Sequence, residues 1–228
     1  MKKITKYIPT IILTLLCSCS DYFDIVPDNV TTLDIVFNNR NTAERYLANC
    51  YHFVPDHGSV KRIPGMGAGH ECWFYTTNDS HFDNEVSFYI ARGLQNIDAP
   101  YANYWDGEGG SNLPMFRAIR ECNIFLDYVR DQHKVNDLTD SERKRWIAEV
   151  NVLKAYYHFF LFEHYGPIPI VDKALPVSTD PEGVKVTRMP VDQIVDYMVK
   201  LIDDSYKDLP PVITMEATEM GRLTQPAA

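Results

Sequence analysis

The sequence predicts an all-α protein built from pairs of helices. Four segments place apolar residues at intervals of three and four, the spacing that gives a helix one apolar face. Capping residues or prolines mark the ends of these segments. Hydrophobic residues make up 45% of the chain and charged residues 23%, a balance typical of a globular protein with a core. We therefore expect one helical domain that follows an N-terminal signal.

The first 18 residues have the pattern of a secretory signal. Lys2, Lys3 and Lys6 precede a short apolar run, Ile8–Leu16. This run is too short to span a bilayer, which needs about 20 apolar residues. The run ends in the sequence LCSC, residues 16–19. This sequence resembles the lipobox of bacterial lipoproteins, in which an aliphatic, a variable and a small residue precede the lipidated cysteine.

The lipobox resemblance assigns the lipid anchor to Cys19. Cys17 does not fit as the acceptor, because Leu16 stands where a small residue is required. Processing would then remove residues 1–18 as a signal peptide and leave residues 19–228 as the mature domain. Several acyl chains, at about 0.8 kcal/mol per buried methylene, would hold the protein stably on a membrane. An ordinary cleaved signal with an incidental cysteine is the alternative interpretation.

Charge and cysteine content exclude two classes of protein. The formal net charge is −9, and no basic stripe is present to neutralise phosphates, so a nucleic-acid partner is not expected. Three further cysteines, Cys50, Cys72 and Cys122, form no C-x-x-C pair. Their odd number argues against a disulfide framework. Cys50 and Cys122 lie in apolar helical patterns, so we expect both thiols to be buried.

The first helix is predicted over Asn41–Phe53, after an irregular leader at residues 21–36. Its apolar face consists of Ala43, Tyr46, Leu47, Cys50 and Phe53, and Pro55 ends it. Residues 56–103 then lose helical periodicity, because glycine and proline interrupt them repeatedly. Irregular stretches of this length inside a compact domain are often functional.

Candidate ligand-binding residues lie within this irregular stretch. Trp73, Phe74 and Tyr75 offer flat rings for the apolar face of a sugar, and Asn78 and Asp79 offer polar groups for its hydroxyls. The alternative is that these rings pack the loop onto the helices.

Two further helices follow the irregular stretch. The first is predicted over Pro114–Asp131, with an apolar stripe that includes Phe116, Ile119 and Leu126. The second begins at a capping box, with Thr139 as N-cap and Glu142 three residues later, and ends before Gly166. Its C-terminal half, AYYHFFLFEHY, is apolar nearly all round, so we expect it to be buried on several sides.

The remaining chain is predicted to hold a short extended piece and one more helix. Residues 168–175 form the extended piece. Pro190 opens the helix near its first position, and Pro210-Pro211 ends it. The apolar face consists of Ile194, Val195, Met198, Leu201 and Ile202. The final residues, GRLTQPAA, look like the approach to a fifth helix, which leads us to expect that the sequence is truncated.

No catalytic or metal site is predicted. The pairs His52/His57 and His158/His164 lack the i, i+4 spacing that places two metal ligands on one helix face. Acidic residues such as Asp83, Glu85 and Glu108 could serve a glycoside hydrolase, but no spacing singles out a pair. Nucleotide-binding and nucleophile motifs are missing, and no cofactor is expected.

Several stretches, taken in order, resemble the SusD-like (RagB/SusD) lipoproteins. They are CSDYFD followed by VPDN at 26–29, the helix NTAERYLAN at 41–49, PYANYWDG at 100–107, the R-x-x-N-x-F-L pattern at 120–126, EVNVLKAYYHFFLFEHYGPIP at 149–169, and Gly221-Arg222. The resemblance implies a fold of tetratricopeptide-like helix pairs that carry long irregular loops. The chain would be the N-terminal portion of such a protein.

The resemblance also implies a function. SusD-like proteins sit on the outer membrane, face outward, bind oligosaccharides or other nutrients, and cap a SusC-type TonB-dependent transporter without catalysing a reaction. The rings of Tyr101, Tyr104 and Trp105, with the polar Asn103 and Asp106, offer a second possible sugar-binding cluster. Because PYANYWDG matches across the family, a structural role is favoured for these rings. Two alternatives remain open: a helical-repeat lipoprotein that binds only proteins, and a surface glycoside hydrolase.

Overall fold

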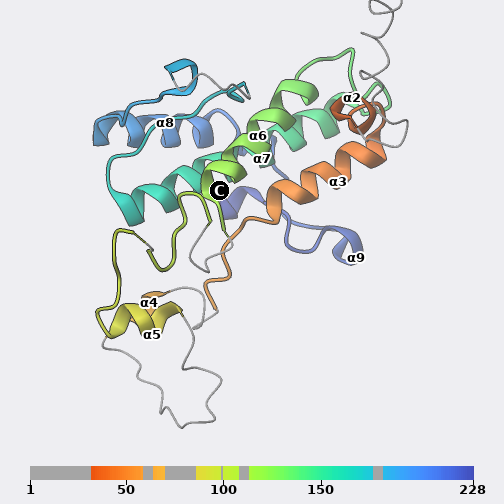
Figure 1. The fold of residues 1–228 in the computed structure, drawn as a ribbon. Helices are drawn as coiled ribbons and strands as arrows, with labels where there is room; N and C mark the ends of the chain where they lie inside the picture. The colour runs from red at the N-terminus through yellow and green to blue at the C-terminus, as the bar shows by residue number, and fades with distance from the viewer. Residues whose placement is uncertain (1–31, 59–63, 70–85, 99, 108–112, 177–181) are drawn as a thin grey trace, which may run out of the picture. The chain divides into compact units, whose positions relative to one another are not determined.

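Helices are the only regular secondary structure in the described part of the chain, as expected for an all-α protein. The computed structural model describes residues 32–58, 64–69, 86–98, 100–107, 113–176 and 182–228. Figure 1 shows the main helices, α3, α6, α7 and α8. The chain divides into two units, residues 1–35 and 36–228. The packing described below lies within the second unit.

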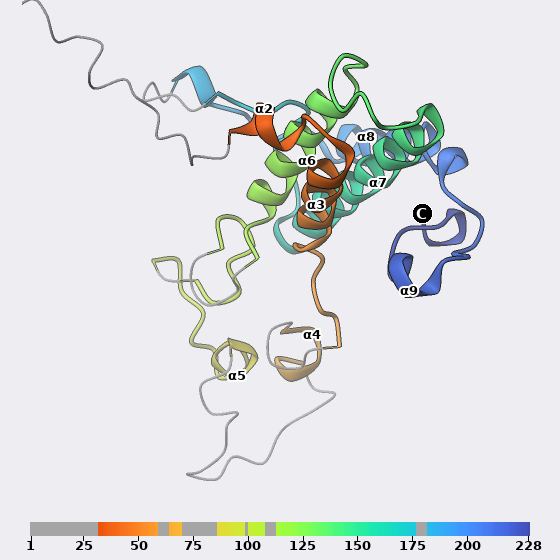
Figure 2. The same ribbon diagram turned by 90° about the vertical axis from the view of Figure 1, so that its right-hand side faces the viewer.

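Helix α3 spans Arg40–Tyr51, close to the predicted range. The Asn39 side chain caps its start by accepting a hydrogen bond from Thr42 N at 3.1 Å. Ala43, Leu47 and Cys50 form its buried face. Figure 2 shows α3 beside α6 and α7, the two helices that it contacts.

Helix α6 spans Met115–Val129, and helix α7 spans Asp140–Tyr165. Both hydrogen bonds of the predicted capping box are present at the start of α7. The helix ends before Gly166, where φ is +68°, a conformation that glycine adopts at low cost. The sequence therefore predicted both ends of α7 correctly.

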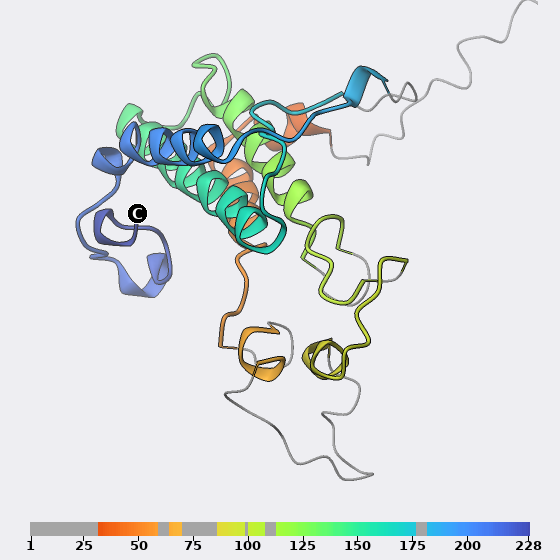
Figure 3. The ribbon, with the colours of Figure 1, turned by 90° about the vertical axis from the view of Figure 1, so that its left-hand side faces the viewer.

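Helix α8 spans Val191–Asp203 and packs along α7 (Figure 3). Pro190 is the N-cap residue, directly before the first helical residue, so it opens the helix as predicted. The helix ends well before Pro210. A single 3₁₀ turn, Tyr206–Asp208, follows it.

Four one-turn helices occupy stretches for which the sequence predicted no helix. They are α2 at Leu33–Val36, α4 at Pro64–Gly67, α5 at Val86–Ala91 and α9 at Glu216–Glu219. The expectation of an irregular leader and an irregular stretch was therefore wrong at α2, α4 and α5. A segment of four to six residues is too short to show the periodicity on which the prediction depends.

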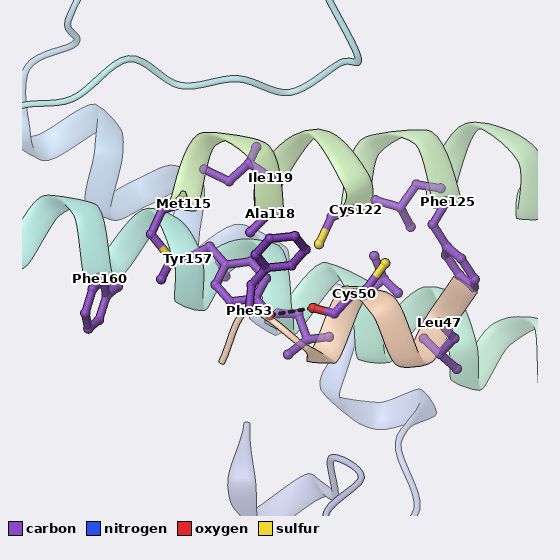
Figure 4. Close-up of a cluster of buried hydrophobic side chains, with 14 of the residues drawn as sticks. Leu47, Cys50, Phe53, Met115, Ala118, Ile119, Cys122, Phe125, Tyr157 and Phe160 are labelled. Atoms are coloured by element: carbon purple, nitrogen blue, oxygen red, sulfur yellow. Dashed lines mark hydrogen bonds between the residues drawn. The ribbon is translucent and has the colours of Figure 1, made fainter. Parts of the chain in front are cut away.

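The core lies where α3, α6 and α7 meet (Figure 4). Cys50 and Cys122 are fully buried free thiols, as predicted. The neighbouring Cys122 thiol, together with burial, raises the pKa of Cys50, so this thiol stays protonated. Tyr157 Oη donates a 2.5 Å hydrogen bond to the Cys50 carbonyl near the end of α3. This bond joins α3 to the C-terminal half of α7.

The C-terminal half of α7 is largely buried, as its apolar sequence predicted. Tyr157, His158, Phe160 and Leu161 are all inaccessible to solvent or nearly so. Phe159 is the exception among its large apolar residues, because 48% of it is exposed. His57 and Tyr104, from two loop segments, both contact this half of α7.

Candidate functional site

The residues proposed from the sequence for lipid attachment and ligand contact lie outside the described part of the chain. They are Cys19, Trp73, Phe74, Tyr75, Asn78 and Asp79. The structure therefore brings none of them together. It does describe contacts near both ends of the predicted ligand-binding stretch, residues 56–103.

Aromatic contacts fix the chain near both ends of this stretch. At the start, His57 Nε2 hydrogen-bonds to Tyr156 Oη, and the His57 ring meets the Phe160 ring edge-on at 6.0 Å. Near the other end, the Tyr89 and Tyr101 rings stack at 4.7 Å with an interplanar angle of 17°. The stretch therefore begins on the C-terminal half of α7.

Tyr104 holds the following turn, residues 100–107, on the same half of α7. Its buried ring meets Phe160 at 4.9 Å and His164 at 4.8 Å, edge-on in both cases. Its backbone N–H donates to Tyr165 Oη at 2.9 Å. Burial raises the Tyr104 pKa to about 12, so the hydroxyl stays neutral. These contacts agree with the structural role favoured for this ring.

The turn is rigid because its polar groups bond to one another. The Asn103 side chain donates to Asp106 Oδ1 at 2.6 Å and accepts from Trp105 N at 3.1 Å. Gly107 has φ +89°, and a Cβ at this position would lie 2.9 Å from the Pro114 ring. Only glycine therefore fits both the conformation and the space. The turn sets the position of Trp105.

Trp105 lies within a cluster of rings and one cation. Its ring meets Phe116 at 4.6 Å and Tyr165 at 5.4 Å, edge-on in both cases. The Arg188 guanidinium lies 5.2 Å from the Trp105 ring centre and donates to the Pro167 carbonyl at 2.8 Å. The cluster thus joins the loop turn, α6, the end of α7 and the chain before α8.

A hollow of about 270 Å³ opens beside Trp105. Rings and aliphatic side chains form most of its wall, and two cations, Arg120 and Lys173, face it. The lining residues are Trp105, Phe116, Arg120, Pro169, Val171, Lys173, Leu175, Val184 and Val186. We treat this hollow as the candidate site within the described residues.

Polar side chains of α6 hold the extended segment 168–175, which forms one wall of the hollow. Arg120 donates to the Leu175 carbonyl, and Asn123 Nδ2 donates to the Val171 carbonyl at 3.0 Å. Residues 120 and 123 are three apart and so share one helix face. This contact gives a structural reason for the arginine and asparagine of the R-x-x-N pattern.

Lys154 and His158 of α7, together with Tyr197 of α8, also bond to the extended segment 168–175. The Lys154 ammonium, only 2% exposed, bonds to Asp172 Oδ1 at 2.7 Å, and Tyr197 Oη donates to the same oxygen at 2.9 Å. Val171 N donates to His158 Nε2 at 3.4 Å, while His158 Nδ1 lies 2.7 Å from the Lys154 carbonyl. His158 therefore accepts at Nε2 and donates at Nδ1, which requires the neutral ring.

Stability is expected to fall as the pH drops from about 7 to about 5, because burial lowers the His158 pKa to about 4. In the unfolded chain a histidine takes up its proton near pH 6.5. The unfolded state therefore binds more protons over this range, and acid favours it. The free energy of unfolding from urea titrations should fall by about 2 kcal/mol. A His158→Gln variant should lose most of this pH dependence; an unchanged slope would contradict the neutral role of His158.

Comparison with known families decides the classification. A family model described as "Starch-binding associating with outer membrane" matches residues 21–228, which is nearly the whole chain. The chain belongs to the SusD-like family. This confirms the resemblance drawn from the ordered motifs. No curated protein sequence matches the chain.

Solved SusD-like structures share the fold. A laminarin-binding SusD-like protein superposes with a TM-score of 0.61 at 17% identity, over 83% of this chain and 38% of its own. A SusD-like protein from Bacteroides fragilis also has a TM-score of 0.61 at 17% identity, covering 90% and 34% of the two chains. A second B. fragilis protein, titled as carbohydrate-binding, has a TM-score of 0.56 at 21% identity, covering 84% and 36%. This chain spans little more than a third of their length.

The described residues of the SusD-like chain contain no helix with the length and apolarity needed to cross a membrane. They also contain no group of three or more histidine, cysteine, aspartate or glutamate side chains placed to hold a metal ion.

Sequence reasoning missed the hollow of this SusD-like chain. It noted Trp105 as a possible sugar contact and Arg120 as part of a pattern, but did not consider Lys173 or Arg188. These residues come from separate segments between positions 105 and 188, and only the packing of α6 on α7 brings them near one another.

Proposed function

We propose that this SusD-like chain forms part of a cell-surface lipoprotein that binds an oligosaccharide or another nutrient. The observation that carries the proposal is the family match over residues 21–228, whose description names starch binding and the outer membrane. We propose no catalytic step and no cofactor. The lipobox supports an anchor at Cys19 in the outer membrane.

The ligand contacts are proposed to include Trp73, Phe74, Tyr75, Asn78 and Asp79. Their residue types supply rings for the apolar face of a sugar and polar groups for its hydroxyls. The contact of His57 with Tyr156 supports this proposal, because it fixes the start of the stretch on α7, and the Tyr89–Tyr101 stack joins two parts of the stretch near its end. A fixed scaffold lowers the entropic cost of ordering a binding loop.

The partner is proposed to be a SusC-type TonB-dependent transporter in the same membrane. Tethering both proteins to one surface would raise the effective concentration of captured ligand at the transporter. The test is affinity purification of the full-length lipoprotein from detergent-solubilised outer membranes of its host. We expect a transporter of this type to copurify in comparable amount. Copurification with soluble proteins alone, and with no transporter, would contradict the transport role and favour a protein-interaction lipoprotein.

A further inference from the structure

We propose that the hollow beside Trp105 binds an anionic sugar unit, one that bears a carboxylate or a sulfate. This inference rests on the proposed function, because it specifies the kind of sugar.

Two cations, Arg120 and Lys173, line the hollow, and a third, Arg188, lies over the Trp105 ring. None of the three has a carboxylate partner among the described residues. Arg120 bonds to the Leu175 carbonyl, and Arg188 bonds to the carbonyls of Tyr165 and Pro167. Lys173 makes no ion pair within the described ranges and is exposed at the rim. Carbonyl oxygens satisfy guanidinium N–H groups but cancel none of their charge. The positive charge at the hollow therefore remains available to a ligand.

Two acidic side chains that are close in the sequence are paired with lysines. Asp172 is paired with Lys154, and Glu182 is paired with Lys185 at 3.4 Å. Asp106 accepts from the Asn103 amide, which is neutral and cancels none of the Asp106 charge. A local excess of positive charge in a chain of net charge −9 is unusual. Such a patch would attract an anion selectively, since the overall charge would repel one elsewhere.

The size and walls of the hollow favour a single sugar ring. Its volume of about 270 Å³ is near the lower end of the roughly 300–1,000 Å³ typical of ligand pockets. Trp105, Phe116, Val171 and Val186 supply apolar surface for the C–H face of a pyranose. Arg120 and Lys173 would meet an acidic substituent on the same ring. A neutral sugar would use only the apolar walls.

Lys173→Gln tests the inference, and Lys185→Gln is the matched control. Lys173 holds no other group in the described structure, so its loss should leave the fold intact, whereas Arg120 also supports the wall. Lys185 is an exposed lysine nearby that is paired with Glu182 and does not line the hollow. Affinity electrophoresis of the native protein would use polygalacturonate, dextran sulfate and neutral amylose. Circular dichroism would verify the fold of each variant.

We expect the wild-type protein to bind at least one of the two anionic polymers more tightly than amylose. Lys173→Gln should weaken that binding about five-fold, which corresponds to roughly 1 kcal/mol for one partly exposed charge, and added salt should weaken it too. Lys185→Gln should bind as the wild type does. The polymer that responds to Lys173→Gln identifies the acidic group.

Two results would overturn the inference in distinguishable ways. Binding of amylose at least as tight as that of both anionic polymers, unaffected by Lys173→Gln, would refute the anionic ligand and leave the proposed function standing. Failure of a folded protein to bind any of these polymers, or any member of a wider glycan panel, would refute the inference and the proposed function together.

Discussion

Replacing Glu149 by alanine is expected to lower the free energy of unfolding by about 3–5 kcal/mol. The Glu149 carboxylate is fully buried on α7. Arg222 bonds to it through Nε and Nη2 at 2.9–3.1 Å, Arg145 bonds at 2.9 Å, and Tyr51 Oη donates at 2.9 Å. Removal of the carboxylate would leave two guanidinium groups that share Glu219 as their main remaining carboxylate partner.

The same network fixes the segment around Arg222 on α3 and α7. Leu223 N donates to Tyr51 Oη at 3.1 Å, and Arg145 also pairs with Glu219 at 2.8 Å. Arg145 Nη2 already has no hydrogen-bond partner among the described residues, so the site has little means of compensation. These contacts give a structural role to the arginine of the Gly221-Arg222 pair that the sequence singled out.

Urea unfolding of the purified variants measures this effect. Glu163→Ala is the matched control, because Glu163 is an exposed carboxylate on the same helix, and it should change stability by less than about 0.5 kcal/mol. Glu149→Gln keeps the side-chain shape and removes the charge, so it should lower the free energy of unfolding almost as much as Glu149→Ala does. A Glu149→Ala effect no larger than that of Glu163→Ala would show that the network does not stabilise the fold.

Replacing Cys19 by alanine is expected to move the protein from the membrane fraction to the soluble fraction. The reason is chemical: without the thiol no diacylglycerol can be attached, and the anchor is lost. Palmitate labelling of the host cells, followed by fractionation and immunoblotting, measures both effects. The label should disappear and most of the protein should leave the membranes.

Cys17→Ala is the control for this experiment. Cys17 precedes the proposed cleavage point, so its loss should leave labelling and membrane attachment unchanged. Persistent labelling after Cys19→Ala, together with loss of labelling after Cys17→Ala, would assign the anchor to the other cysteine. If both variants keep the palmitate label and stay in the membrane fraction, lipidation at this motif is refuted.

Local signals allowed the long helices to be predicted from the sequence. In α7 the Thr139–Glu142 capping box and Gly166 mark the two ends, and the apolar pattern between them is long enough to identify. The burial of Cys50 and Cys122 followed from their places on apolar faces. The one-turn helices α2, α4, α5 and α9 could not be predicted, because a single turn carries no period.

The candidate site could be predicted only in part. The sequence pointed to Trp105 through its residue type, but the ring partner Phe116 and the cation Arg188 come from distant segments. Their meeting depends on how α6 and the chain before α8 pack near the end of α7, which no local spacing encodes. The roles proposed for Trp73, Phe74, Tyr75, Asn78 and Asp79 remain predictions, since these residues lie outside the described ranges.

Isothermal titration of the purified protein against a panel of neutral and acidic oligosaccharides tests the central claim most directly. The proposed function predicts saturable binding of at least one glycan in the panel. Circular dichroism and urea unfolding of the same sample would show that the protein is folded. A folded protein that binds none of the panel would contradict the assignment of this SusD-like chain to glycan capture.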